Sequence, residues 1–234
     1  MASNRRAFLA ATAAGALTAV PAAAAPAPRR PHPLPASASP DPGEPPRTAR
    51  TALGELLAGN QRYAAGRPRH PHDTPARQHL LAEAQHPFAV VVGCIDSRVP
   101  PELVFDQGLG DLLCIRTAGE VLDEAVLGSV QYGVAELGIP LVLVLGHERC
   151  GAVAATLEHL RTGAPVTGHL RRLVDGILPA ARRTRALPGD WAEHTLRAHT
   201  ARVRDSLRTD PAFGSARIEA ARFDLDTGLV SLLP

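Results

Sequence analysis

The sequence predicts an α/β fold: a mostly parallel sheet with helices on both faces and a C-terminal edge strand. Apolar runs of strand length alternate with segments whose apolar residues recur every three or four positions, a pattern typical of β-α-β units. The last two strand-like runs are joined only by Asp224–Gly228, a connection short enough for an antiparallel hairpin. A chain of 234 residues with 45% hydrophobic content can form one such domain with a buried core.

Residues 1–25 resemble a twin-arginine export signal. Arg5 and Arg6 are followed by a mild apolar run over 10–20, and small residues at 22–25 offer cleavage sites. The apolar run is too short and too rich in alanine to span a membrane. We therefore expect export to the periplasm, cell envelope or exterior by a twin-arginine route. The alternative is a disordered alanine-rich leader whose two arginines occur by chance.

The composition divides the rest of the chain into a linker and one domain. Residues 26–50 are rich in proline and lack apolar periodicity, which is typical of an extended linker, and 51–234 form the predicted domain. The net charge is +2, and removing residues 1–25 would leave none, so neither nucleic acid nor an anionic membrane is a predicted partner. Three cysteines at no framework spacing do not predict a disulfide scaffold.

The first part of the domain contains two predicted helices and a strand. Apolar residues keep helical spacing over Leu53–Tyr63, and Gly66–Pro68 ends that helix. A second short helix is predicted over Pro75–Gln85. The continuous apolar run Phe88–Cys94 is typical of a strand that is buried on both faces, as strands in parallel sheets are.

The middle of the chain continues the alternation. Pro100–Glu102 begins a short helix, and Leu112–Arg116 is a second apolar strand. Val126–Leu137 has one apolar helical face, and the apolar run Leu141–Leu145 is the third strand. A further helix is predicted over Gly151–His159.

The end of the chain predicts helices and then the edge of the sheet. The segment Gly168–Asp210 is helical and arginine-rich, and its arginine-dense faces are typical of solvated surface. Arg217–Phe223 and Leu229–Leu233 are the two strands of the closing hairpin.

Three potential metal ligands follow two of the predicted strands. Cys94 ends the first strand, and His147 and Cys150 follow the third. The carboxyl ends of parallel strands are where α/β sheets bind ligands. Two thiols and one imidazole suit Zn²⁺, and three protein ligands leave a fourth position open, as in catalytic sites. The alternatives are a capping histidine with a buried cysteine, or a redox dithiol, although no C-x-x-C motif is present.

An acidic and a basic residue follow the first predicted ligand. In an extended segment Cys94, Asp96 and Arg98 would point to one side, and the carboxylate and guanidinium could pair through two hydrogen bonds. A carboxylate fixed in this way could accept a hydrogen bond from a zinc-bound hydroxide. The alternative is an ordinary salt bridge at the end of a strand.

Four segments together resemble the β-class carbonic anhydrases: Cys94–Val99, Gly110–Leu112, Arg116–Gly119 and Gly146–Ala152. The resemblance implies an α/β fold, a homodimer or higher homo-oligomer, and a zinc ion held by three ligands. The implied zinc ligands are Cys94, His147 and Cys150.

The resemblance also implies roles for three further residues. Asp96 and Arg98 would form a catalytic pair, and in some members the aspartate occupies the fourth zinc position at lower pH in a closed, inactive form. Gln85 stands where members can carry a glutamine that hydrogen-bonds the substrate. This chain departs from the family over Arg116–Glu120, and it has Val91 where members with a separate bicarbonate pocket carry tryptophan.

The activity that the resemblance implies is reversible hydration of CO₂ to bicarbonate and a proton, with zinc lowering the pKa of its bound water to about 7. CO₂ and bicarbonate would then be the small-molecule partners. Two other functions stay open: a sibling enzyme of the same fold that hydrolyses carbonyl sulfide or carbon disulfide, and a non-catalytic extracytoplasmic zinc-binding protein.

Overall fold

The computed structural model describes residues 46–234, so the predicted signal and most of the predicted linker lie outside the described residues. The strands are β1 (Ala89–Cys94), β2 (Leu112–Thr117), β3 (Leu141–His147), β4 (Arg217–Phe223) and β5 (Val230–Leu232). The α-helices are α1 (Ala49–Ala64), α2 (Pro75–Leu80), α3 (Pro101–Val104), α4 (Glu124–Gln131), α5 (Gly151–Thr162), α6 (Leu170–Thr184) and α7 (Trp191–Thr209). Shorter helical turns are η1 (Ala118–Glu120), η2 (Tyr132–Glu136) and η3 (Pro211–Phe213).

The five strands form one sheet in the order β2-β1-β3-β4-β5. The first four are parallel, and β5 is antiparallel to β4 at the edge, which confirms the predicted fold class. The chain runs from β1 to β2 on one side and then crosses to β3 on the other. The gap between the carboxyl ends of β1 and β3 is therefore a topological switch point, where open α/β sheets bind ligands.

Helices cover both faces of the sheet, and the side chains of each strand alternate between the two cores. In β1, Ala89 and Val91 pack with residues of α1 and α3, whereas Val90 and Val92 pack with α4, η2 and α7. Both faces are apolar because both are covered, which explains why the predicted strands are continuous apolar runs.

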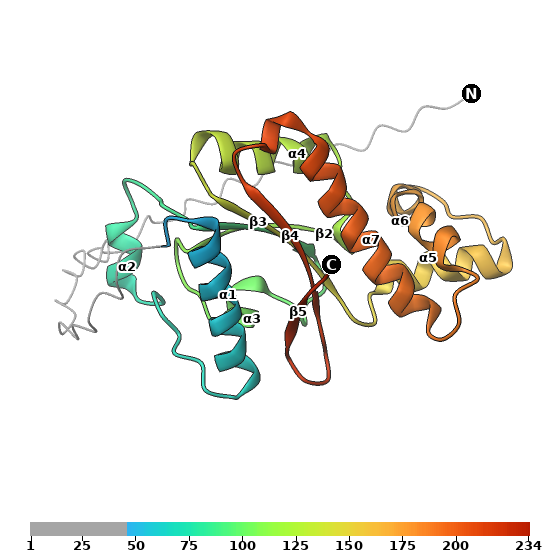
Figure 1. The fold of residues 1–234 in the computed structure, drawn as a ribbon, viewed down its shortest axis with the longest axis horizontal. Helices are drawn as coiled ribbons and strands as arrows, with labels where there is room; N and C mark the ends of the chain where they lie inside the picture. Colours follow the sequence, from blue (N-terminus) through green and yellow to red (C-terminus); the bar gives the residue numbers. More distant parts are fainter. Residues whose placement is uncertain (1–45) are drawn as a thin grey trace, which may run out of the picture. The chain divides into compact units, whose positions relative to one another are not determined.

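A third apolar cluster lies at the carboxyl end of the sheet, where α5, α6 and α7 group together (Figure 1). Cys94 and Cys150 belong to this cluster, with Val153, Ile177 and Leu196 among their buried neighbours. The two thiols therefore lie in apolar surroundings and not in an open loop.

The structure corrects one predicted boundary. The second helix ends at Leu80 and not at Gln85. None of its residues is buried, so no packing sustains further turns. In the part of the chain described here, no helix has the length and apolar character needed to cross a bilayer.

Candidate metal centre

The three predicted ligands converge at the switch point. Cys94 is the last residue of β1 and His147 the last residue of the neighbouring β3, while Cys150 is the N-cap residue of α5. All three are buried, with exposed fractions of 5%, 0% and 3%. One ligand atom from each lies within 4.8 Å of the others. Zn–S bonds of about 2.3 Å and Zn–N bonds of about 2.0 Å separate tetrahedral ligands by about 3.5–3.8 Å, so ligand atoms this close can reach one zinc ion.

The histidine tautomer also fits a metal. Nδ1 of His147 lies 2.8 Å from the carbonyl oxygen of Glu148, which can only accept, so Nδ1 carries the proton. Nε2 is left with a lone pair, and it is buried without a hydrogen-bond partner among the described residues. A buried acceptor without a partner is costly, and a metal ion between Nε2 and the two sulfurs would satisfy it.

The two thiol groups shift each other's pKa in opposite directions. The hydrogen bond from the Cys150 thiol lowers the pKa of Cys94 against the opposing effect of burial, with help from the backbone N–H of Gly119. The charge on Cys94 together with burial raises the pKa of Cys150. Cys150 also occupies the N-cap position of α5, where the helix dipole favours an anion. A divalent cation would release the remaining proton and hold both groups as thiolates.

Asp96 and Arg98 form the predicted ion pair beside the three ligands. Nε of Arg98 lies 2.9 Å from Oδ1 of Asp96, and Nη2 lies 2.8 Å from Oδ2. Oδ2 is also 3.8 Å from Nε2 of His147. The Arg98 guanidinium holds the pKa of the Asp96 carboxyl well below its usual range, so this carboxyl stays ionised at neutral pH.

A turn, and not the predicted extended segment, brings Asp96 and Arg98 together. After Cys94 the chain does not stay extended but turns, because the N–H of Val99 donates to the carbonyl of Asp96 at 3.1 Å. The turn also brings the backbone N–H of Arg98 to Oδ1 of Asp96 at 3.0 Å. Arg116 holds the start of the turn, donating from Nε to the carbonyl of Cys94 at 2.8 Å and from Nη2 to that of Asp96 at 2.7 Å.

Glu148 fixes the carbonyl that orients His147. Its N–H donates to the carbonyl of Phe223 at 3.0 Å, and its Oε2 accepts from the N–H of Leu225 at 3.1 Å. Oε1 forms an ion pair with Nη2 of Arg222 at 3.3 Å. Contacts with β4 and with the turn after it therefore hold Glu148 on both its backbone and its side chain.

Sequence reasoning did not single out two buried residues near the centre. Glu120 is fully buried and neither carboxylate oxygen has a hydrogen-bond partner among the described residues. Burial, and then the charge of Cys94, raise its pKa well above the usual range, so this carboxyl is held neutral. His199 of α7 is 1% exposed and lies 2.7 Å from the carbonyl oxygen of Gly119. The only sequence signal for Glu120 was that the family often has asparagine at this position. No sequence feature pointed to His199.

The structure of one chain does not bring Gln85 to this centre. Gln85 is exposed and precedes β1, whereas Cys94 ends that strand. Six strand residues alone span about 20 Å. Gln85 instead lines a separate cavity of about 520 Å³ with Leu81, Leu109 and Gly110. Its assignment as a substrate-binding residue stays a prediction.

The fold and the site together define an α/β protein with a two-cysteine, one-histidine centre at a switch point. A family model described as carbonic anhydrase matches residues 89–230. The chain therefore belongs to the carbonic anhydrase family.

Individual relatives agree with this assignment. Carbonic anhydrase 2 of Mycobacterium tuberculosis is 49% identical over 125 residues, which cover 53% of this chain and 60% of that protein. The carbonic anhydrase of Mycolicibacterium smegmatis is 51% identical over 125 residues, covering 53% and 61%. These matches therefore span less than two thirds of either relative.

Solved structures share the fold. The β-carbonic anhydrase CcaA has a TM-score of 0.60 and 24% identity, with 78% of this chain and 87% of that one covered. One of two tetrameric β-carbonic anhydrases from Sordaria macrospora has a TM-score of 0.60 and 20% identity, covering 78% and 97%.

Proposed function

We propose that this protein catalyses the reversible hydration of CO₂ to bicarbonate and a proton at a zinc ion held by Cys94, His147 and Cys150. The observation that carries the proposal is the convergence of these three ligands beside an aspartate that an arginine holds in place. Family membership supports the same activity. Three ligands would leave one zinc position for the reacting oxygen.

Bound zinc would supply a Lewis acid and lower the pKa of its bound water to about 7. The role that we assign to Asp96 is to accept a hydrogen bond from the nucleophile and so orient it toward CO₂. This role requires an ionised carboxylate with a fixed direction, and the pairing with Arg98 supports both conditions. Arg98 would also restrain Asp96 from taking a zinc position itself, as the family resemblance implies for closed forms.

Zinc analysis and stopped-flow CO₂ hydration on one purified sample test the proposal. We expect one zinc per chain and CO₂ hydration that is lost when a chelator removes the metal. The same sample is then assayed with carbonyl sulfide and carbon disulfide. Turnover of these without CO₂ hydration would favour the sibling hydrolase, and bound zinc with no turnover of any substrate would favour a non-catalytic zinc protein.

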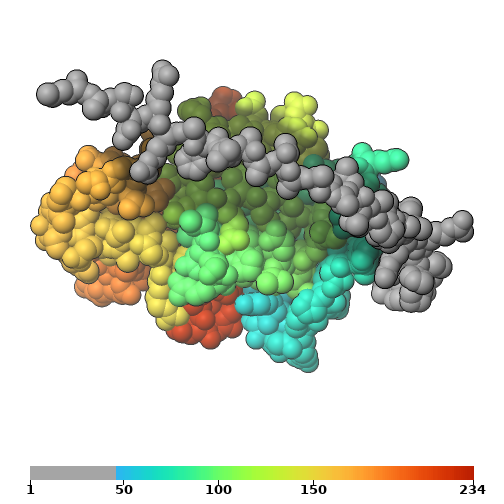
Figure 2. Space-filling view, turned by 180° about the vertical axis from the view of Figure 1, so that it is seen from behind, coloured from blue at the N-terminus to red at the C-terminus, as the bar shows by residue number. Residues whose placement is uncertain are grey.

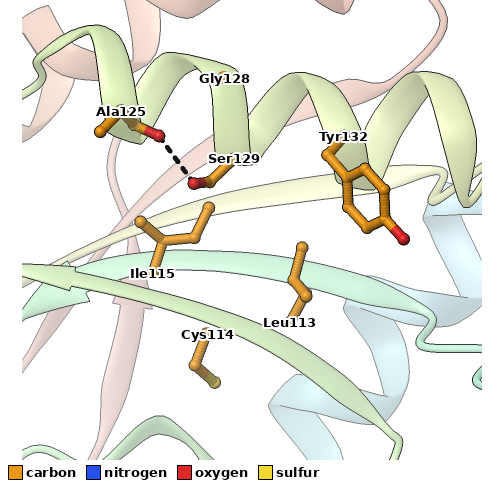
Figure 3. Close-up of a pocket in the computed structure, with 7 residues that line it drawn as sticks. All are labelled: Leu113, Cys114, Ile115, Ala125, Gly128, Ser129 and Tyr132. Carbon is orange, nitrogen blue, oxygen red and sulfur yellow. Dashed lines mark hydrogen bonds between the residues drawn. The ribbon is translucent and has the colours of Figure 1, made fainter.

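We also propose that the protein is a homodimer or a higher homo-oligomer. The outer edge of β2 is unpaired in the described chain, and such edges readily pair or become covered. A cavity of about 440 Å³ lies between β2 and α4, and Figure 3 shows Leu113 and Ile115 pointing toward the helix. Tyr132 lines the same cavity and is 50% exposed.

Figure 2 shows that the segment around residues 100–130 (green), which includes β2, is exposed between the yellow α5 segment and the cyan segment that follows α1. A second copy on this face would cover its apolar side chains. Light scattering measures the mass directly, and a monomer at micromolar concentration would refute the proposal.

Gln85 lies far from the candidate metal centre of its own chain. Any substrate contact that it makes would therefore be at the metal centre of another copy.

The localisation that we propose is export by the twin-arginine route. It rests on Arg5 and Arg6 and on the apolar run that follows them, all of which lie outside the described residues.

A further inference from the structure

A buried histidine on α7 contacts the loop beside the metal centre. Nε2 of His199 lies 2.7 Å from the carbonyl oxygen of Gly119, a residue 80 positions earlier in the chain. A carbonyl oxygen only accepts, so Nε2 carries the proton and donates it. The side chain is 1% exposed, and its Nδ1 has no hydrogen-bond partner among the described residues. The contact with Gly119 is therefore the polar interaction that fixes this ring.

Gly119 in turn contacts one of the three ligands. Its backbone N–H donates to Sγ of Cys94 at 3.4 Å. An N–H that donates to a thiolate withdraws part of the negative charge that the sulfur would give to a metal, and it fixes the direction of the sulfur lone pairs. Gly119 thus has a ligand sulfur on its N–H side and His199 on its carbonyl side.

The conformation of this loop needs support from its surroundings. Gly119 has φ +67°, and a Cβ built on it would lie 2.8 Å from Cδ1 of Ile177 and 2.9 Å from Cβ of Ala152. Glu120 follows with φ +51°, which is unfavourable for a residue with a side chain. Conformations of this kind persist where neighbouring groups hold them. The carboxyl group of Glu120 has no partner among the described residues. The hydroxyl of Thr117 spans the loop by donating to the carbonyl of Val121 at 2.9 Å, and His199 holds the carbonyl of Gly119 itself.

We propose that His199 is a positioning residue for the metal centre: its Nε2–H holds the carbonyl of Gly119 and thereby keeps the Gly119 N–H on Sγ of Cys94. This inference rests on the proposed zinc site. His199 does not touch the reacting atoms but acts through one backbone residue.

The ring has one protonation state at neutral pH. Burial lowers the pKa of His199 to about 4, the hydrogen bond to Gly119 opposes this, and the charge of Arg202 adds to it. The imidazole is therefore neutral, with its single proton on Nε2. A side-chain amide with the same reach could replace this donor.

Two amide substitutions that differ by one methylene test the proposal. In His199→Gln the amide N–H can reach the position of Nε2, whereas in His199→Asn it falls short of the Gly119 carbonyl. Val203→Ala is the control, because Val203 is buried on the same helix and lines the same cavity of about 220 Å³ as His199. Each full-length variant is measured for zinc affinity by chelator competition and for the sulfur-to-metal charge-transfer band of its Co²⁺ form.

We expect His199→Asn to bind zinc about tenfold more weakly or worse and to shift the charge-transfer band, as loss of an outer partner of a metal ligand does. His199→Gln should stay within about threefold of the unchanged protein, and Val203→Ala should lose stability without losing zinc affinity. If the asparagine variant does not fold, His199→Phe keeps the ring without the donor and replaces it in the comparison.

Two results would overturn the inference. Equal zinc affinity and an unchanged band in the asparagine and glutamine variants would show that the hydrogen bond does not affect the centre. Equal loss in both variants would show that His199 acts only by packing. Both results presuppose that the unchanged protein binds one zinc, and its failure to do so would refute the proposed function itself.

Discussion

The guanidinium of Arg98 holds both carboxylate oxygens of Asp96, at 2.9 and 2.8 Å, while Oδ2 of that carboxylate lies 3.8 Å from Nε2 of His147. The carboxylate is thus next to the proposed metal ligands, and the arginine fixes its direction. Because this pair is only two residues apart and is exposed on the Arg98 side, it can be altered without disturbing the core.

We expect Asp96 and Arg98 to act as one catalytic unit. Asp96→Asn and Arg98→Ala should each reduce the CO₂ hydration rate by on the order of 10²-fold, and the double variant should lose little more, because groups that act together are non-additive. Rates are measured across pH with zinc content determined for each variant. Strictly additive losses in zinc-replete proteins would show that the two side chains act independently.

The Arg98→Ala variant should also shift the pH optimum upward. Without its arginine the carboxylate is free to approach the metal and compete with water, and hydroxide competes better at higher pH. Asp96→Asn provides no anionic ligand, so its optimum should not shift in this way. A shift of equal size in both variants would contradict the explanation.

Cys150→Ser should remove zinc and lower the stability of the fold, because binding at a site formed only in the native state stabilises that state. Cys114→Ser is the matched control, since Cys114 lies within β2 and outside the ligand cluster. Metal analysis and thermal unfolding with and without chelator separate the two effects. Full zinc retention in Cys150→Ser would refute the ligand assignment.

Arg222→Gln should weaken zinc binding by about tenfold, because Arg222 holds Glu148, whose carbonyl fixes the His147 tautomer. Arg217→Gln is the control on the same strand, since its ion pair with Glu219 has no contact with the centre. Chelator competition gives both affinities. Similar affinities in the two variants would show that the Glu148 carbonyl needs no support from the Arg222 side chain.

Asp106 should contribute to stability at neutral pH and lose that contribution in acid. Burial would raise the pKa of this carboxyl, but the hydrogen bonds from Arg62 and from the N–H groups of Arg69 and His70 outweigh it and lower the pKa. A lowered folded-state pKa means that the stabilisation is present above the unfolded pKa of about 3.9 and is lost as the pH falls through the folded value.

Asp106→Asn should therefore cost about 2–3 kcal/mol at pH 7 and progressively less below about pH 4. Urea unfolding at pH 7, 5 and 3.5 measures the difference. Asp73→Asn, at an exposed position, is the control and should change stability by less than about 0.5 kcal/mol. A constant difference at all three pH values would contradict the expected linkage.

Replacing Arg5 and Arg6 by lysine should keep the protein inside the cell, because the twin-arginine route requires that pair. Fractionation of cells expressing both forms measures the effect. Arg29 and Arg30 replaced by lysine, within the predicted linker, serve as the control and should leave export unchanged. Export that is equally efficient after the first exchange would mean that another route is used.

The sequence by itself determined the main elements and the three residues that we propose as metal ligands. Continuous apolar runs predict strands covered on both faces, and the residues that follow such strands must lie at the same edge of a parallel sheet. Cys94 and His147 could therefore be paired from local patterns alone, and the soft donors then indicated zinc. The ion pair of Asp96 and Arg98 was also predictable, since its partners are only two positions apart, although a turn and not an extended strand produces it.

The tertiary structure decided which distant groups complete the site. His199 lies 80 residues from Gly119, and in sequence it is one of two histidines on its helix with no local feature to set it apart. Arg222 likewise reaches Glu148 only because β4 pairs with β3 in a fixed register. Such contacts depend on how α7 and β4 pack against the carboxyl end of the sheet. Packing is set by the sum of many apolar contacts, so no short stretch of sequence encodes these partners.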